Sequence, residues 1–214
     1  MSEKITFYKE GELDTLTIAP AYQEAFSDWP WYEVSKCADP KLVQRCAGGL
    51  SRIALGETCT TCKQSPTQPA YEPTELVERF QMLEATRPTR WYVESIKDSP
   101  ALVALAWTAL PETIAQEKYP DVPPMQNWLV ETLGSKPVIW LDEVFADKTI
   151  RPKGNLINFR RMCEGFMTAF DTTQLAYRTI SPAMIRTAEN NFNTTPVENV
   201  PDRRAFITIR GESL

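Results

Sequence analysis

The chain of 214 residues contains no histidine. This absence removes the commonest general base and the commonest metal ligand in proteins. Acid–base chemistry must then rely on carboxylates, on tyrosine or on a water molecule that such groups hold. For the same reason, any metal site must be built from sulfur or oxygen ligands.

Long apolar runs are missing as well. No run approaches the roughly 20 residues that a membrane helix needs, and residues 1–15, MSEKITFYKEGELDT, lack the apolar core of a signal peptide. We therefore expect no membrane partner and a cytoplasmic location.

An excess of basic residues is also absent. The chain has 23 lysine and arginine residues against 28 aspartate and glutamate residues, which gives a net charge of −5 and a pI near 5.0. Because nucleic-acid binding usually leaves a basic surface, this balance argues against a nucleic-acid partner and suits a cationic substrate better. A hydrophobic content of 43% with both charge signs interspersed is typical of a folded soluble protein with a sizeable core.

Cysteine is concentrated in one short part of the chain. Four of the five cysteines, Cys37, Cys46, Cys59 and Cys62, lie between positions 37 and 62, and the last two form a Cys-x-x-Cys pair. In a cytosolic protein this density favours a metal over disulfides, and four thiolates suffice for a closed tetrahedral zinc site. We predict that these four residues bind a structural zinc ion. The alternative is that Cys37 and Cys46 are small buried hydrophobic residues beside an incidental pair.

The hydrophobic pattern predicts strands and helices interspersed along the chain. Apolar residues at alternate positions indicate strands, and apolar residues at helical spacing indicate helices. We expect strands at 5–18 with a turn at 10–12, then at 91–96, 101–110, 138–145, 175–177 and 204–210, and helices at 19–26, 75–86, 125–133, 159–170 and 182–191. This order predicts a mixed α+β fold. We expect a single domain over residues 1–214 with a Cys-rich insertion at 37–72.

The stretch from Trp140 to Leu156, WLDEVFADKTIRPKGNL, reads as a strand that passes through a loop into a helix. A helix N-terminus presents unpaired backbone N–H groups and the positive end of the helix dipole, which suits a pyrophosphate. Gly154 permits a close approach of the backbone to a ligand, and Arg151 and Lys153 add positive charge. The alternative, which the local motif alone favours, is an ordinary strand-to-helix turn.

This stretch, together with the order of elements around it, resembles the GNAT superfamily of acetyl-CoA-dependent N-acetyltransferases. The resemblance rests on LDEVFAD at 141–147 and RPKG at 151–154, with Leu156 standing where the family usually has glycine or alanine. It implies a mostly antiparallel central sheet flanked by helices and a loop whose amides bind the pyrophosphate of CoA. The residues that it implies for acetyl-CoA binding are Val144, Phe145, Ala146, Arg151, Pro152, Lys153, Gly154, Asn155 and Leu156.

The segment AYQEAFSDWPWYEV at 21–34 is similar to the first helix and the aromatic acceptor wall of acetyltransferases in this superfamily. The resemblance implies that Trp29, Trp31 and Tyr32 bind the acceptor. The alternative is a packed aromatic corner, because exposed aromatic side chains are costly and buried ones are common.

Transfer of an acetyl group to an amine requires a base for the amine and an acid for the departing thiolate. Adjacent strand residues point to opposite faces, so we expect only one of Asp142 and Glu143 to reach a given pocket. We predict Glu143 as the base, directly or through water, with Asp142 in reserve and Tyr177 as the acid. The alternative is that both carboxylates belong to structural ion pairs.

The predicted function is therefore acetyl-CoA-dependent N-acetylation of a small-molecule amine or a peptide. Two residues depart from the family pattern: Leu156, and Thr187 at a position where the family often carries a tyrosine acid. An alternative is therefore a catalytically inactive GNAT-fold module that binds an acyl-CoA or a protein. A third alternative is a zinc-stabilised interaction protein without a CoA site. The acceptor and the oligomeric state stay open, with a homodimer as one candidate, because edge and interface strands look alike in sequence.

Overall fold

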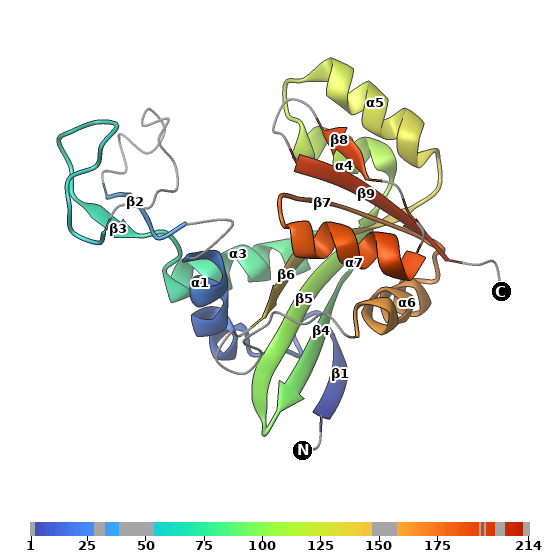
Figure 1. The fold of residues 1–214 in the computed structure, drawn as a ribbon, viewed down its shortest axis with the longest axis horizontal. Helices are drawn as coiled ribbons and strands as arrows, with labels where there is room; N and C mark the ends of the chain where they lie inside the picture. Colours follow the sequence, from blue (N-terminus) through green and yellow to red (C-terminus); the bar gives the residue numbers. More distant parts are fainter. Residues whose placement is uncertain are drawn as a thin grey trace.

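The computed structural model describes residues 3–27, 33–38, 54–146, 158–192, 194, 196–199 and 204–211. A seven-stranded sheet forms the centre of the molecule (Figure 1). Its strands follow the order β1 (Glu3–Lys9), β4 (Thr89–Ile96), β5 (Ser99–Ala109), β6 (Val138–Ala146), β7 (Gln174–Thr179), β9 (Arg204–Arg210) and β8 (Val197–Asn199). Neighbouring strands are antiparallel except β6 and β7, which are parallel. The predicted mixed, mostly antiparallel sheet is confirmed.

Helices cover both faces of the sheet. One face packs against α6 (Phe159–Phe170) and α7 (Pro182–Phe192), and the other packs against α1 (Ala19–Ser27), α3 (Pro73–Thr86), α4 (Pro111–Lys118) and α5 (Pro123–Leu133). No helix within the described ranges has both the length and the apolar character needed to cross a membrane.

Strand β5 joins the cores on the two faces because its side chains alternate between them. Leu102 and Ala104 pack beneath α6 and α7, whereas Val103 and Leu105 pack beneath α1 and α3, and Trp107 packs beneath α4 and α5. A strand that is buried on both faces needs no polar side chains, which explains the apolar run that predicted it.

The predicted strand at 5–18 is wrong in its second half. Strand β1 ends at Lys9, and Thr15–Thr17 forms a short 3-10 helix, η1. The Asp14 side chain caps this helix by accepting a hydrogen bond from the backbone N–H of Leu16 at 3.1 Å. Leu16 is exposed, so the alternation in TLTIA does not mark a sheet face. Local capping by an aspartate outweighs the alternating pattern here.

A two-stranded ribbon projects from the rest of the molecule beside α1 and α3 (Figure 1). It pairs β2 (Ser35–Cys37) with β3 (Thr67–Pro69) in antiparallel register. Strand β2 leads into the predicted Cys-rich insertion at 37–72, and β3 lies within it. The hydrophobic pattern predicts neither strand, because each has only three residues.

Phe166 is the central apolar side chain of α6. It is fully buried, and the Phe7 ring of β1 meets it edge-on with 5.7 Å between the ring centroids. We predict that Phe166→Ala lowers the free energy of unfolding by about 3–5 kcal/mol, because it removes a large buried ring and leaves a cavity.

Denaturant unfolding checks this prediction, with Met82→Ala as the control. Met82 lies on α3 with 69% of its surface exposed, so its truncation should change the free energy of unfolding by less than about 0.5 kcal/mol. A loss for Phe166→Ala as small as that of the control would contradict the packing described for α6.

Candidate active site

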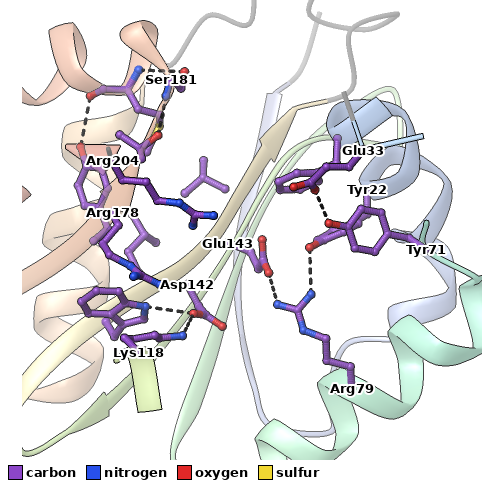
Figure 2. Close-up of a pocket in the computed structure, with 17 residues that line it drawn as sticks. Tyr22, Glu33, Tyr71, Arg79, Lys118, Asp142, Glu143, Arg178, Ser181 and Arg204 are labelled. Atoms are coloured by element: carbon purple, nitrogen blue, oxygen red, sulfur yellow. Dashed lines mark hydrogen bonds and ion pairs between the residues drawn. The ribbon is translucent and has the colours of Figure 1, made fainter. Parts of the chain in front are cut away.

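A cavity of about 360 Å³ lies where β6 and β7 separate. The two parallel strands pair only through Ile139 with Leu175 and Trp140 with Ala176. Side chains from β6, β7, α1 and α3 line the space between them (Figure 2). Beyond Trp140, the β7-facing edge of β6 pairs with no strand in the described part of the chain. An open strand edge of this kind can pair with the backbone-like groups of an extended ligand.

Strand β6 contains a β-bulge at Asp142. Two consecutive residues of β5, Leu105 and Ala106, lie opposite Glu143 and Leu141, so Asp142 is an extra residue between them. A bulge breaks the two-residue alternation of side chains, and both carboxylates line the same cavity. This corrects the expectation that only one of them would reach a given pocket.

Glu143 is buried at 8% exposure and sits between α3 and the cavity (Figure 2). Arg79 of α3 forms an ion pair with its carboxylate and also donates a hydrogen bond to the Tyr22 hydroxyl at 3.1 Å. Burial raises the pKa of Glu143, the Arg79 charge lowers it and the Asp142 charge raises it, with a net pKa of about 7. Such a carboxylate can accept a proton near neutral pH and release it again.

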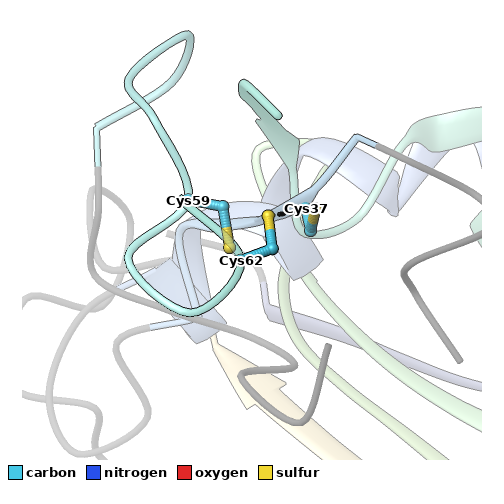
Figure 3. A group of neighbouring side chains, drawn as sticks. All are labelled: Cys37, Cys59 and Cys62. Atoms are coloured by element: carbon cyan, nitrogen blue, oxygen red, sulfur yellow. Dashed lines mark hydrogen bonds between the residues drawn. The ribbon is translucent and has the colours of Figure 1, made fainter. Parts of the chain in front are cut away.

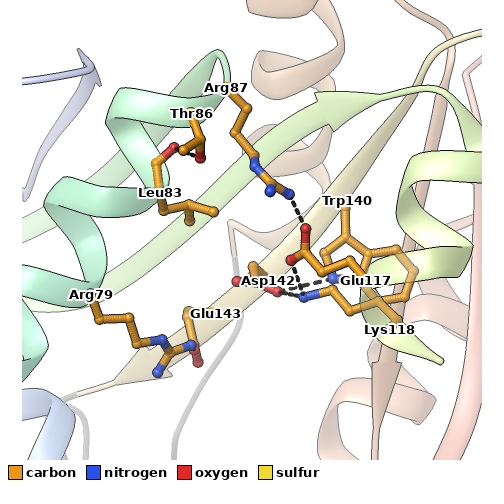
Figure 4. A network of polar contacts seen from close by, with 9 residues as sticks. All are labelled: Arg79, Leu83, Thr86, Arg87, Glu117, Lys118, Trp140, Asp142 and Glu143. Carbon is orange, nitrogen blue, oxygen red and sulfur yellow. Dashed lines mark hydrogen bonds and ion pairs between the residues drawn. The ribbon is translucent and has the colours of Figure 1, made fainter. Parts of the chain in front are cut away.

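Asp142 belongs to a second, separate network (Figure 4). Lys118 of α4 forms an ion pair with its carboxylate, and the Trp140 indole donates to the same oxygen at 3.0 Å. The Lys118 ammonium also lies 3.5 Å from Glu117, which pairs with Arg87. These contacts tie the Asp142 carboxylate to α4 and to the Trp140 side chain of its own strand.

One wall of the cavity is aromatic and acidic. Tyr22 and Phe26 of α1 stack with 4.5 Å between ring centroids, and Tyr71 meets Tyr22 edge-on at 5.0 Å. The Tyr71 hydroxyl donates a hydrogen bond to the Glu33 carboxylate. We call these four residues the aromatic wall, and all four line the cavity.

The opposite wall is basic. Arg178 of β7 and Arg204 at the start of β9 lie across the cavity from Glu143 (Figure 2). The Arg178 guanidinium lies 4.9 Å from the centroid of the Tyr119 ring, over its face. Opposite charges on facing walls impose a direction on a polar ligand that enters the cavity.

Tyr177, the predicted acid, also lines the cavity. Its hydroxyl donates to the backbone carbonyl of Met184 at 3.2 Å, and burial raises its pKa well above the ordinary value for tyrosine. The hydroxyl therefore keeps its proton at all physiological pH values. It must leave Met184 before it can donate that proton to a ligand.

The other predicted site residues fall into two groups. Val144 lines the cavity, Phe145 packs in the core beneath α1 and α3, and Ala146 contacts the core beneath α6 and α7. The remaining residues predicted to bind acetyl-CoA or the acceptor lie outside the described residues: Arg151, Pro152, Lys153, Gly154, Asn155, Leu156, Trp29, Trp31 and Tyr32.

Sequence reasoning missed the residues that surround Glu143. Arg79 sits on a helix that was predicted, but no spacing rule distinguishes an inward arginine from a solvated one. Tyr22 and Phe26 are four positions apart on a predicted helix, a spacing that places them on one face. Glu33 and Tyr71 are 38 positions apart in sequence, one before Cys37 and the other after Cys62, and the β2–β3 ribbon helps to bring them together.

Three cysteines form a compact cluster at the far end of the ribbon (Figure 3). The sulfur atoms of Cys37, Cys59 and Cys62 all lie within 4.8 Å of one another, with 3.7 Å between those of Cys37 and Cys62. Thiolates that share a tetrahedral zinc at about 2.3 Å are about 3.8 Å apart, so this arrangement fits three corners of such a site. Cys46, the fourth predicted ligand, lies outside the described residues.

Several solved structures with a similar fold are described as acetyltransferases. The PaiA N-acetyltransferase of Thermoplasma acidophilum, solved in complex with coenzyme A, matches with a TM-score of 0.54 and 7% identity over 98% of this chain and 99% of that chain. A Corynebacterium glutamicum structure, described as histone acetyltransferase HPA2 and related acetyltransferase, matches with a TM-score of 0.54 and 13% identity. The match covers 100% of this chain and 99% of that chain. The chain has the GNAT fold.

A third solved structure, arylalkylamine N-acetyltransferase 2 of Aedes aegypti, matches with a TM-score of 0.53 and 10% identity over 98% of this chain and 100% of that chain. No family model and no curated protein matches the sequence. The likeness to these solved structures is therefore one of fold.

The Arg79–Glu143 ion pair should control the pKa of Glu143. Because the Arg79 charge lowers the pKa of Glu143, Arg79→Met should raise that pKa above its value of about 7. Carboxyl-carbon NMR titration measures this pKa, and Glu143→Gln identifies the resonance.

Arg87→Met is the matched control, because Arg87 lies just beyond the end of the same helix and pairs with Glu117 instead. It should leave the Glu143 titration unchanged. An equal Glu143 pKa in the Arg79 and Arg87 variants would refute the electrostatic description of the site.

Proposed function

We propose that this protein is an acetyl-CoA-dependent N-acetyltransferase whose acceptor is the amine of a small molecule or a peptide. The observation that carries the proposal is a buried carboxylate, Glu143, with a pKa of about 7 in a cavity between two separating strands. A base of this pKa suits the deprotonation of an amine near neutral pH.

The open edge of β6 supports the binding of acetyl-CoA. The acyl-carrying arm of CoA is extended and contains two amide groups, so it can pair with an exposed strand edge as an added strand does. Leu141 to Ala146 provide this edge beside the cavity. We assign the backbone of Val144, Phe145 and Ala146 to the arm and the loop from Arg151 to Leu156 to the pyrophosphate.

Bound acetyl-CoA supplies an acyl thioester that an amine can attack, with formation of a C–N bond and cleavage of the C–S bond. Glu143 accepts the proton that the amine loses, directly or through one water molecule. Asp142 stays in reserve as a base, and its carboxylate is held by Lys118 and Trp140. Tyr177 is assigned to return a proton to the departing sulfur after its hydroxyl leaves Met184.

A small amine is the acceptor that the cavity favours. The cavity volume of about 360 Å³ lies within the range of small-molecule binding sites. The aromatic wall and the nearby carboxylates attract a cationic, partly apolar amine. Trp29, Trp31 and Tyr32 directly follow α1, which carries half of that wall, so we keep them as proposed acceptor residues.

We also propose a structural zinc ion bound by Cys37, Cys59 and Cys62, with Cys46 as the fourth ligand. The sulfur distances support three thiolate ligands, and a fourth thiolate would close the tetrahedron. In this proposal residues 1–214 form one cytoplasmic domain with a zinc-stabilised insertion at 37–72, because cytosolic cysteines of this density rarely form disulfides.

Glu143→Gln tests the proposed base. Primary amines of several classes (polyamines, arylalkylamines, amino acids and dipeptides) are screened with acetyl-CoA, and thiol release is followed. With the amine that reacts fastest, Glu143→Gln should lower kcat by about 10²-fold or more while the affinity for acetyl-CoA stays unchanged. Asp142→Asn is the control and should lower kcat less.

The pH dependence of the wild-type reaction gives an independent check on the same residue. A base acts in its deprotonated form, so kcat/KM should rise with pH through about 7 and then level off, and this step should vanish in Glu143→Gln. Bound acetyl-CoA with no transfer to any amine would overturn the proposed function and indicate a binding module instead.

Native mass spectrometry tests the zinc proposal. The wild-type protein should carry one zinc ion per chain, and Cys59→Ser should carry none, because loss of one thiolate weakens a closed site severely. Cys163→Ser is the control, since Cys163 is buried in α6 away from the cluster. Zinc-free native protein would reject the metal site.

A further inference from the structure

The segments 33–38 and 54–71, which we call the cysteine lobe, carry almost no hydrophobic core. From residue 54 to residue 66 the single buried residue is Cys59, and Leu55 is 55% exposed. The lobe's own apolar cluster, among the described residues, consists of Cys37, Cys59 and Cys62 alone. Segments too small to bury a core usually fold around a metal or a disulfide.

The β2–β3 ribbon connects this cluster to the cavity. At the cluster end, Cys37 of β2 lies opposite Thr67 of β3. At the other end, the backbone N–H of Ala70 donates to the carbonyl of Val34 at 3.1 Å. The ribbon is three residue pairs long, so only Ser35 and Lys36 separate Cys37 from Val34 along the chain.

The cavity end of the ribbon delivers half of the aromatic wall. Glu33 precedes β2 and Tyr71 follows β3, and the Tyr71 hydroxyl donates to the Glu33 carboxylate. The backbone N–H of Glu33 donates to the carbonyl of Phe26 at 2.7 Å, and the Gln23 side chain donates to the carbonyl of Tyr71. The pair is therefore set by the ribbon on one side and by α1 on the other.

We propose that a zinc ion at Cys37, Cys59 and Cys62 is a positioning site for the acceptor: it orders the ribbon and thereby fixes Glu33 and Tyr71 in the cavity wall. The inference rests on the proposed zinc site and on the proposed function, which supplies the acceptor. It states that zinc binding at the cysteine cluster and the positions of Glu33 and Tyr71 are coupled. Glu143, Arg79 and the β6 edge belong to other elements and do not depend on the ion.

Hydrogen–deuterium exchange tests the coupling without acetyl-CoA or any amine. The zinc-loaded protein is compared with protein from which zinc has been removed by a chelator and with Cys62→Ser. Loss of the ion should speed exchange of the Ala70 amide about tenfold or more, because the hydrogen bond to Val34 then opens locally. Amides within β4 and β5 should exchange as before, which shows that the sheet stays folded.

Two control variants separate zinc binding from the contact between Tyr71 and Glu33. Thr61→Ala, an exposed change between Cys59 and Cys62, should keep both zinc and the slow exchange at Ala70. Tyr71→Phe removes the hydroxyl that donates to Glu33, and this variant should still bind zinc and still show slow exchange of the Ala70 amide. With a reactive amine in hand, zinc removal and Tyr71→Phe should each raise its KM several-fold and leave the affinity for acetyl-CoA unchanged.

The outcomes that overturn the inference are distinct from those that overturn the proposed function. If zinc binds but the Ala70 amide still exchanges slowly after the zinc is removed, the ion orders only the cysteine cluster and not the ribbon. Absence of zinc, or a Cys37–Cys62 disulfide in its place, would remove the metal altogether. Neither result bears on acetyl transfer at Glu143. Conversely, if zinc removal speeds exchange at Ala70 but no amine is acetylated, the coupling is supported and the proposed function is wrong.

Discussion

The short parallel contact between β6 and β7 is the constraint on which the site depends. Two residue pairs hold these strands together, and past Trp140 they diverge. The divergence creates the cavity and leaves this edge of β6 without a pairing strand among the described residues. It also places β7 and β9 side chains across from those of α1 and α3. The rest of the sheet is continuous and antiparallel, and helices bury both of its faces, so the gap is held open by a rigid frame.

The bulge at Asp142 adds a second constraint, because it turns two adjacent carboxylates toward one cavity. Their surroundings then separate their roles. Asp142 is held by an ammonium and an indole N–H, whereas Glu143 is buried beside the Tyr22 hydroxyl and a guanidinium that is about half exposed. Burial of a carboxylate with incomplete compensation raises its pKa, and active sites use this effect to obtain a base that works near neutral pH. The same pair of residues in a regular strand would face opposite sides.

Much of the fold could be predicted from the sequence, because the central elements have strong periodicity. The apolar run of β5 and the helical spacing of Phe159 to Phe170 in α6 follow directly from burial on two faces and on one face. The bulge, the early end of β1 and the β2–β3 ribbon could not be predicted, because each depends on local hydrogen bonds or on register between distant segments. For the site, Glu143 could be singled out as a carboxylate on a strand that resembles a GNAT motif, but its partner Arg79 is brought to it only by the packing of α3.

The gap between β6 and β7 is the proposed binding site for the acyl-carrying arm of acetyl-CoA. The melting temperature of the protein, measured with acetyl-CoA, with CoA and without either, tests this binding. A ligand at 100 times its Kd stabilises the folded state by about 2.7 kcal/mol, so both compounds should raise the melting temperature by several degrees in a concentration-dependent manner. An unchanged melting temperature at millimolar acetyl-CoA would show that the gap between the strands does not bind its proposed ligand.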